Sequence, residues 1–174
     1  KSVPVKPEKE GEPLFVKSDI LSGAGHVENE FNDFARQPLL PNQMSRLGPG
    51  QAWGDIDVDG DDDLWLGAAA GSSGQIWLNE GGGSFKPQPS TALQDDAGFE
   101  DMGALWFDAD GDGTMDLYVV SGGNEFQPGD PELKDRLYLN KSGVLTPAPD
   151  GTLPGLKNSG GVVVGADYDR DGDI

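Results

Sequence analysis

The sequence predicts an all-β fold made of β-propeller-type blades, each with four antiparallel strands. Three observations predict it: a repeated acidic segment, short runs of Trp, Tyr, Val and Leu between turn residues, and the lack of a long apolar stripe of helical period. Four short strands in each repeat of about 40–60 residues are typical of a propeller blade. Two repeats and the start of a third predict a partial propeller, because closed propellers usually have about 4 to 8 blades.

The repeat is visible in two kinds of segment. The acidic segment occurs three times, as "AWGDIDVDGDDDLWLG" (52–67), "LWFDADGDGTMDLYVV" (105–120) and "VVGADYDRDGDI" (163–174). An apolar run that ends in Leu-Asn and leads to a glycine turn follows the first two copies, as "QIWLNEGGGSF" (75–85) and "RLYLNKSGVL" (136–145). Each complete unit is therefore expected to contain a strand, an acidic loop, a strand, a turn, a strand, a glycine turn and a fourth strand.

These repeats predict the organisation of the chain. Residues 1–48 are expected to be an N-terminal linker that could add an outer strand to a preceding blade, with "LFVKSDI" (14–20) as the candidate strand. The first repeat is expected at 49–101, the second at 102–160 with an inserted loop at 122–135, and the start of a third at 161–174.

The composition narrows the possible partners. The chain has 31 acidic and 12 basic residues, 27 glycines and no cysteine, and its formal net charge is −19. Such a charge excludes nucleic acid as a partner, because phosphate binding requires clusters of Lys and Arg. An excess of acidic residues can also serve solubility alone. The positions of these residues in the sequence must therefore show whether they bind a partner. No apolar stretch approaches the ~18 residues of a membrane-spanning helix, which predicts that the chain does not span a membrane.

The acidic loops have the spacing of calcium ligands. Carboxylates occupy loop positions 1, 3 and 5, and position 9 in the two complete loops, while position 6 is glycine and position 7 can offer a backbone carbonyl. The candidate metal ligands are Asp55, Asp57, Asp59, Asp61 and Asp63 in the first loop, Asp108, Asp110, Asp112, Thr114 and Asp116 in the second, and Asp167, Asp169, Asp171 and Asp173 in the third.

Charge and ligand type both favour Ca²⁺ as the bound ion. Two carboxylates ~4 Å apart repel by roughly 4 kcal/mol at an effective dielectric of 20, and a divalent cation converts this repulsion into attraction. Many hard oxygen ligands, with a bidentate carboxylate expected at position 9, suit Ca²⁺ better than Mg²⁺, and a chain with one histidine and no cysteine fits zinc poorly. Leu66 and Val119 stand where an EF-hand needs glutamate, so this is not an EF-hand.

The pattern DxDxDGxxDL, followed by an aromatic strand and "LN.G.G.F", resembles the FG-GAP or VCBS repeat, which also builds integrin α-chain propellers. The segment "HVENEFNDFARQPLLPNQMSRLGP" (26–49) and "DRLYLN" (135–140) resemble more narrowly the bacterial surface proteins related to cartilage acidic protein and to ASPIC/UnbV-type proteins. The resemblance implies an extracellular or cell-surface location, and it implies calcium in the loop between the first and second strands of each blade.

The sequence favours a non-catalytic, calcium-binding extracellular repeat scaffold for adhesion or protein assembly, and not an enzyme. The expected partners are calcium ions, neighbouring blades of the same or another chain, and an extracellular protein or glycan. The alternative is the propeller portion of a secreted carbohydrate-binding protein or enzyme. For that alternative, ligand contacts are expected in the 122–135 loop or on exposed tryptophans, whereas the placement in strands favours a core role for Trp53, Trp65, Trp77 and Trp106.

Three further polar residues are expected to have no catalytic role. His26 is expected to be a surface or hydrogen-bonded histidine, because nothing in the sequence supplies a matching nucleophile. Glu100 and Asp101 are sequence neighbours, which says nothing about the spacing that acid and base chemistry needs, and they are expected to be loop charge.

Overall fold

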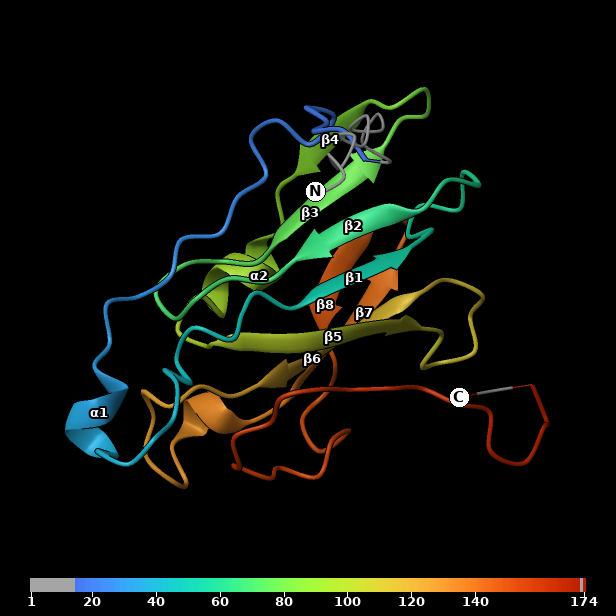
Figure 1. Ribbon diagram of the computed structural model, residues 1–174. Coiled ribbons are helices and arrows are strands. Elements are labelled where there is room, and N and C mark those ends of the chain that lie inside the picture. Colours follow the sequence, from blue (N-terminus) through green and yellow to red (C-terminus); the bar gives the residue numbers. More distant parts are fainter. Residues whose placement is uncertain (1–14, 173) are drawn as a thin grey trace, which may run out of the picture.

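The computed structural model describes residues 15–172 and residue 174, and two four-stranded antiparallel sheets dominate it (Figure 1). The first sheet has the order β1-β2-β3-β4, with β1 Gln51–Gly54, β2 Asp63–Leu66, β3 Gln75–Asn79 and β4 Phe85–Gln88. The second has the order β5-β6-β7-β8, with β5 Asp101–Phe107, β6 Asp116–Ser121, β7 Arg136–Lys141 and β8 Val144–Pro147. The prediction of an all-β fold with four antiparallel strands per blade is confirmed.

Helices are few and short. They are α1 Asp33–Arg36, α2 Thr91–Asp95 and the 3₁₀ helix η1 Pro131–Leu133. The side chain of Ser90 accepts a hydrogen bond from the amide of Leu93 and so caps α2, which connects the two sheets along the chain. No helix among residues 15–172 has the length and apolar character needed to cross a membrane.

Turn residues decide where the outer strands reverse. Lys141 pairs directly with Val144, so β7 and β8 are joined by the two residues Ser142 and Gly143. Their φ angles are +55° and +80°, the left-handed pair of a type I′ turn, whose twist matches that of the flanking strands. In the first sheet, three consecutive glycines with positive φ, at 81–83, lie in the loop between β3 and β4.

The core lies between the two sheets and is built from their central strands. Trp65 of β2, Leu117 and Val119 of β6, and Tyr138 of β7 are completely buried. Burying one such large side chain contributes roughly 1.5–3 kcal/mol to folding. Beta-branched and aromatic residues favour strands because they pack well on a pleated surface, so the same residues form the strands and fill the core.

The sheets approach each other most closely through their inner strands, β1 and β5, which lie side by side (Figure 1). The indole nitrogen of Trp106 in β5 donates to the carbonyl oxygen of Ala52 in β1 over 3.3 Å. A Cβ atom on Gly50 would lie 2.9 Å from the Cα of Gly103. The two backbone segments therefore come together at glycines, where no side chain separates them. This contact aligns the two repeats.

Three of the four tryptophans belong to the core, as predicted, and one does not. Trp65, Trp77 and Trp106 are buried, whereas Trp53 is 48% exposed. The prediction for Trp53 is wrong because β1 alternates, with Ala52 and Gly54 facing inwards and Trp53 facing outwards. The Trp53 ring contacts the edge of the Phe85 ring at a centroid distance of 6.2 Å.

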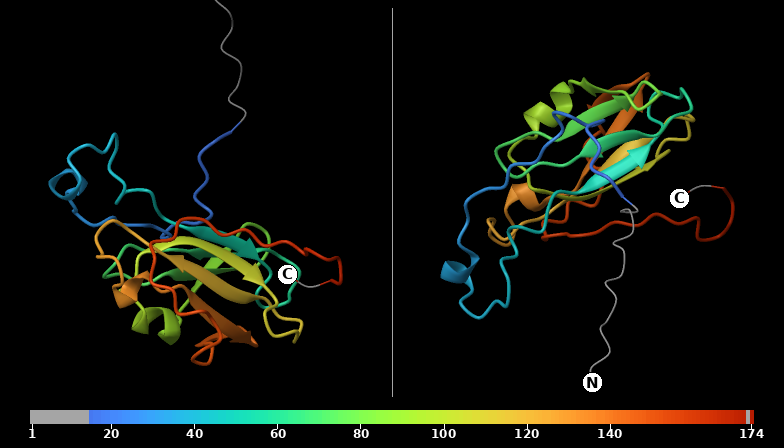
Figure 2. Two further views of the ribbon diagram at one scale, coloured as in Figure 1. Left: turned by 90° about the horizontal axis from the view of Figure 1, so that it is seen from below. Right: turned by 45° about the horizontal axis from the view of Figure 1, so that its top comes forward.

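The N-terminal segment forms no strand between residues 15 and 48, so the expected outer strand at 14–20 is not observed in the described residues. The segment instead follows the first sheet and then reaches the inserted loop 122–135 (Figures 1 and 2). The side chain of Gln75 donates to the carbonyl oxygen of Gly25 over 2.8 Å, and that of Asn29 donates to Ala70 over 2.7 Å. Side-chain hydrogen bonds to loop carbonyls therefore replace strand pairing.

The C-terminal segment runs beside β5 (Figure 2). Gly160 forms a parallel bridge with Gly122, and the amide of Gly160 donates to Ser121 over 2.9 Å. A Cβ atom on Gly103 would lie 3.1 Å from the carbonyl oxygen of Gly161. The start of the third repeat thus lies against the inner strand of the second, on the side opposite the first repeat.

A buried ion pair joins β5 and β7 within the second sheet, and its carboxylate also bonds to the segment that follows β2. The guanidinium of Arg136 donates to Asp101 over 2.5 Å, with only 9% and 5% of the two side chains exposed. The other oxygen of Asp101 accepts from the amide of Ala68, which follows β2, and the guanidinium lies 4.3 Å from the centre of the Phe99 ring. The prediction that Asp101 is loop charge is therefore wrong: it belongs to β5 and to the core.

Replacing Arg136 by alanine should lower the free energy of unfolding by about 3–5 kcal/mol, because the buried Asp101 would lose its ion-pair partner. Urea denaturation measures this change. The matched control is Lys86→Ala, which removes the exposed Lys86–Glu80 pair and should cost at most about 1 kcal/mol. Equal and small effects of the two substitutions would show that the buried pair does not support the fold.

Candidate metal centres

The three acidic loops, defined as residues 55–63, 108–116 and 167–172, occupy equivalent places in the repeats. The first joins β1 to β2, and the second joins β5 to β6. The third follows the C-terminal segment that lies beside β5. Each complete loop therefore connects the inner strand of a blade to its buried second strand.

The first aspartate of each loop folds the loop backbone around itself. One carboxylate oxygen accepts a hydrogen bond from the amide of the glycine at position 6 in all three loops. The pairs are Gly60 to Asp55 (3.0 Å), Gly113 to Asp108 (2.9 Å) and Gly172 to Asp167 (3.1 Å). The first aspartate thus shapes the loop in addition to offering oxygen atoms.

Two positions in each loop have left-handed backbone. The glycine at position 6 has φ of +100°, +87° and +103° in the three loops. Position 4 is also left-handed, at Val58 (+64°), Gly111 (+77°) and Arg170 (+67°). A β-branched residue such as Val58 rarely adopts this conformation, so the first loop stores strain that the second loop avoids with glycine.

The structure gathers carboxylates within each loop. One oxygen from each of three aspartates lies within 4.8 Å of the others, in the groups Asp55, Asp57 and Asp63; Asp108, Asp110 and Asp116; and Asp167, Asp169 and Asp171. Three hard, negatively charged oxygens at this spacing match the ligand preference of calcium, whose oxygens lie about 2.3–2.6 Å from the ion. The donor chemistry of all three loops therefore fits the cation that the sequence predicted.

The remaining predicted ligands have other partners or lie elsewhere. Asp59 and Asp112, at position 5, stand outside the groups of their loops, and their carboxylates accept from the amides of Asp61 (3.0 Å) and Thr114 (2.9 Å). The Thr114 hydroxyl donates to Asp112 over 2.6 Å, which lowers the pKa of Asp112. Asp59, Asp61, Asp112 and Thr114 stay predicted ligands, and Asp173 lies outside the described residues.

The aspartate at position 9 has a structural task in both complete loops. Asp63 and Asp116 are completely buried, and each uses both oxygens to accept backbone hydrogen bonds. The donors to Asp63 are the amides of Ile56 (3.0 Å) and Asn79 (2.7 Å), and the donors to Asp116 are those of Ala109 (2.8 Å) and Asn140 (2.7 Å). Each aspartate therefore ties the start of its loop to the third strand of its blade.

In the first loop, burial and repulsion between neighbouring carboxylates disfavour the charged forms of Asp63 and Asp57. Burial raises the pKa of Asp63, and the neighbouring charges of Asp57 and Asp59 add to the increase. The pKa of Asp57 is raised for the same two reasons. A nearby cation favours the charged form of a carboxylate and so acts in the opposite direction.

The asparagine of the shared "LN" element belongs to the same architecture. The side chain of Asn79 donates to the carbonyl oxygen of Asp62 (3.2 Å), and that of Asn140 donates to the equivalent Met115 (3.0 Å). Asn140 also donates to Ile56 in the first acidic loop over 2.8 Å. The repeat in the sequence signalled these residues, but it gave no sign that Asn140 connects two repeats.

Sequence reasoning missed a buried glutamate outside the loops. Glu100 is only 2% exposed, so the prediction that it is loop charge is wrong, and one of its oxygens accepts from the amide of Ala70 over 2.8 Å. Burial, together with the charges of Glu28, Glu125 and Asp101, raises its pKa to about 7. His26 is hydrogen-bonded, as expected: it contacts Glu28 at 3.1 Å and the carbonyl of Gly67 at 3.3 Å.

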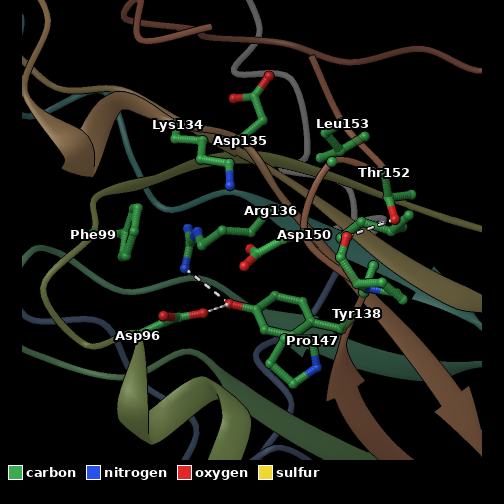
Figure 3. Close-up of a pocket in the computed structure, with 14 residues that line it drawn as sticks. Asp96, Phe99, Lys134, Asp135, Arg136, Tyr138, Pro147, Asp150, Thr152 and Leu153 are labelled. Atoms are coloured by element: carbon green, nitrogen blue, oxygen red, sulfur yellow. Dashed lines mark hydrogen bonds between the residues drawn. The ribbon is translucent and has the colours of Figure 1, made fainter. Parts of the chain in front are cut away.

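A pocket of about 180 Å³ lies beside β7 and β8 (Figure 3). Three of its polar groups form a network: the hydroxyl of Tyr138 donates to Asp96 over 2.6 Å, and Arg136 donates to the same hydroxyl over 3.3 Å. Burial and the hydrogen bond to Asp96 raise the pKa of Tyr138, so the phenol stays protonated. This network holds α2 against the second sheet.

Asp116 and Asp110 should respond differently to substitution when a chelator removes divalent cations. Asp116→Ala should lower the free energy of unfolding by about 2–3 kcal/mol, because the amides of Ala109 and Asn140 lose their acceptor. Asp110→Ala should change it by less than about 0.5 kcal/mol, because Asp110 is exposed. Denaturant titrations of both variants provide the comparison, and equal losses would contradict a structural role specific to position 9.

The raised pKa of Glu100 predicts a pH-dependent stability. Its pKa is about 7 in the folded chain and 4.5 without the fold, so the folded state binds the extra proton between these values. The contribution of Glu100 to the free energy of unfolding is therefore fully present below pH 4.5 and is lost as the pH rises through 7. In chelator, the free energy of unfolding of the wild type should fall over this range relative to Glu100→Gln. Parallel pH profiles of the two proteins would refute the assignment.

The comparisons with known proteins agree with the repeat. Residues 48–119, which hold the whole first sheet, β5 and the start of β6, match the family model of the FG-GAP-like repeat. Neither the curated proteins nor the solved structures contain a match to the chain. The narrower resemblance to proteins related to cartilage acidic protein and to ASPIC/UnbV-type proteins is not confirmed. Residues 48–119 are thus similar to the FG-GAP-like repeat, and both sheets consist of four antiparallel strands.

Proposed function

We propose that this chain is a non-catalytic, calcium-binding repeat scaffold of an extracellular or cell-surface protein that serves adhesion or assembly. One observation carries the proposal: three acidic loops, spaced by the repeat, each gather three carboxylates and share the same hydrogen bond from position 6 to position 1. Such regular placement of repelling charges favours a common cation over a general role of acidity in solubility.

Calcium would stabilise the blades through the loops. Each complete loop joins the inner strand of a blade to its buried second strand, so an ion held there opposes separation of the two strands. A ligand at 100 times its Kd adds about 2.7 kcal/mol per site to the free energy of unfolding. Extracellular modules bind calcium with Kd values of about 10⁻⁴–10⁻³ M, which supports a location where calcium is abundant.

Two features support a scaffold in place of an enzyme. Three polar side chains of the pocket beside β7 and β8, Asp96, Arg136 and Tyr138, form a hydrogen-bonded network that holds α2, which is a structural use (Figure 3). At the third repeat, Val162, Val164 and Tyr168 are more than four-fifths exposed beside the second blade. They offer an apolar surface for a neighbouring blade of the same or another chain.

Calcium should raise the melting temperature of the chain by several degrees at millimolar concentration, and a chelator should reverse the increase. Circular dichroism during heating measures the effect, with Mg²⁺ at equal concentration as the comparison. The variant Asp55→Asn/Asp108→Asn/Asp167→Asn should lose most of the calcium-dependent increase. Identical melting curves of the wild type in calcium and in chelator would refute the proposal.

Adhesion is tested with the same proteins. The wild type should bind at least one member of a panel of extracellular matrix proteins and glycans in calcium and lose that binding in chelator. The triple aspartate variant is the control in this assay. Equal binding with and without calcium would show that adhesion does not depend on calcium in the acidic loops.

A further inference from the structure

Three glutamates from distant parts of the chain meet outside the acidic loops. Glu28 belongs to the N-terminal segment, Glu100 precedes β5, and Glu125 lies in the inserted loop 122–135. Burial raises the pKa of Glu100 and of Glu125, and the charge of Glu28 adds to both increases. We call these three residues the glutamate cluster. Figure 1 shows the N-terminal segment and the inserted loop coming together at one end of the two sheets.

Glu125 is the unusual member of the cluster. Both of its carboxylate oxygens are buried, and neither accepts a well-formed hydrogen bond from any described residue, although the amides of Asn124 and Glu125 are near. A buried carboxylate without a partner is costly, and in native structures such a group calls for an explanation such as an ion.

The cluster has little positive charge to balance it. Within residues 15–172, no lysine or arginine forms an ion pair with any of the three glutamates, and His26 contacts Glu28 alone. Arg36 is near but donates to the carbonyl oxygen of Asn124 and to the side chain of Gln127. Glu100 and Glu125 therefore have no cationic or imidazole partner among the described residues.

The backbone around Glu125 is built to hold it in place. Gly123 has a φ of +95°, and a Cβ atom there would lie 2.6 Å from an oxygen of Glu125 and 3.2 Å from Cγ of Glu100. The side chain of Asn124 donates to the fully buried Asp33 over 2.7 Å, and Asp33 in turn accepts from the hydroxyl of Ser45 over 2.6 Å. The close approach of Glu125 to Glu100 is thus imposed by the fold.

We propose that the glutamate cluster is a fourth cation site, which binds a hard divalent cation through Glu125 and Glu100 and is completed by Glu28. The cluster is not among the groups whose oxygens all lie within 4.8 Å of one another, so the ion keeps part of its water shell between the carboxylates. The ion joins the N-terminal segment and the inserted loop to the paired blades. This site does not depend on the acidic loops.

Ion counting tests the site. Equilibrium dialysis against Ca²⁺ or Mg²⁺, followed by elemental analysis, should find one ion fewer in Glu125→Gln than in the wild type, with at least one of the two metals. Glu30→Gln, an exposed glutamate of the same N-terminal segment, is the matched control and should bind as the wild type does. An unchanged ion count in Glu125→Gln with both metals would overturn the proposal.

Two further variants separate this site from the acidic loops and from misfolding. Asp108→Asn should lower the binding of calcium in the second loop and leave the ion that Glu125→Gln removes. Glu100→Gln should weaken the same ion at least about tenfold. In chelator, Glu125→Gln should melt at or above the temperature of the wild type, because a buried charge is gone. If Glu125→Gln melts below the wild type in chelator and Glu100→Gln loses no ion, the cluster has a purely structural role.

Discussion

The buried aspartates Asp63 and Asp116 are the constraint on which each blade depends. Each stands at the first residue of the second strand and accepts one amide from the start of its loop and one from the third strand. Loop, second strand and third strand are thereby connected by a single carboxylate. This arrangement determines the path of the acidic loop through hydrogen bonds within the chain.

The chain manages its negative charge in three ways. Asp101 is neutralised internally by Arg136, and Asp33 is stabilised by hydrogen bonds from Ser45 and Asn124. The acidic loops keep their charge near the surface, where backbone amides and a cation can both reach it. In the glutamate cluster, by contrast, both carboxylate oxygens of Glu125 are buried without a hydrogen-bond partner among the described residues. This cluster lies where the N-terminal segment meets the inserted loop.

The N-terminal segment and the inserted loop, which do not follow the repeat, add contacts between the blades to those of β1 with β5. The N-terminal segment contacts Ala70 and Asn124, which belong to different repeats, through Asn29 and Arg36. In both contacts a side chain donates to a loop carbonyl, so the segment needs no strand of its own. The irregular segments therefore bring together residues that the repeats leave far apart.

The sequence by itself determined the blades and the acidic loops, because both follow local rules: turn residues end strands, and aspartates at loop positions 1 and 3 bring their oxygens close together. It predicted the same for position 5, but Asp59 and Asp112 stand outside the groups of their loops. It also singled out the asparagine of each "LN" element. Only the tertiary structure decided that Asn140 reaches Ile56, that Trp53 faces outwards, and that Glu28, Glu100 and Glu125 meet. Such contacts depend on how the blades and irregular segments pack, and no spacing along the chain encodes that packing.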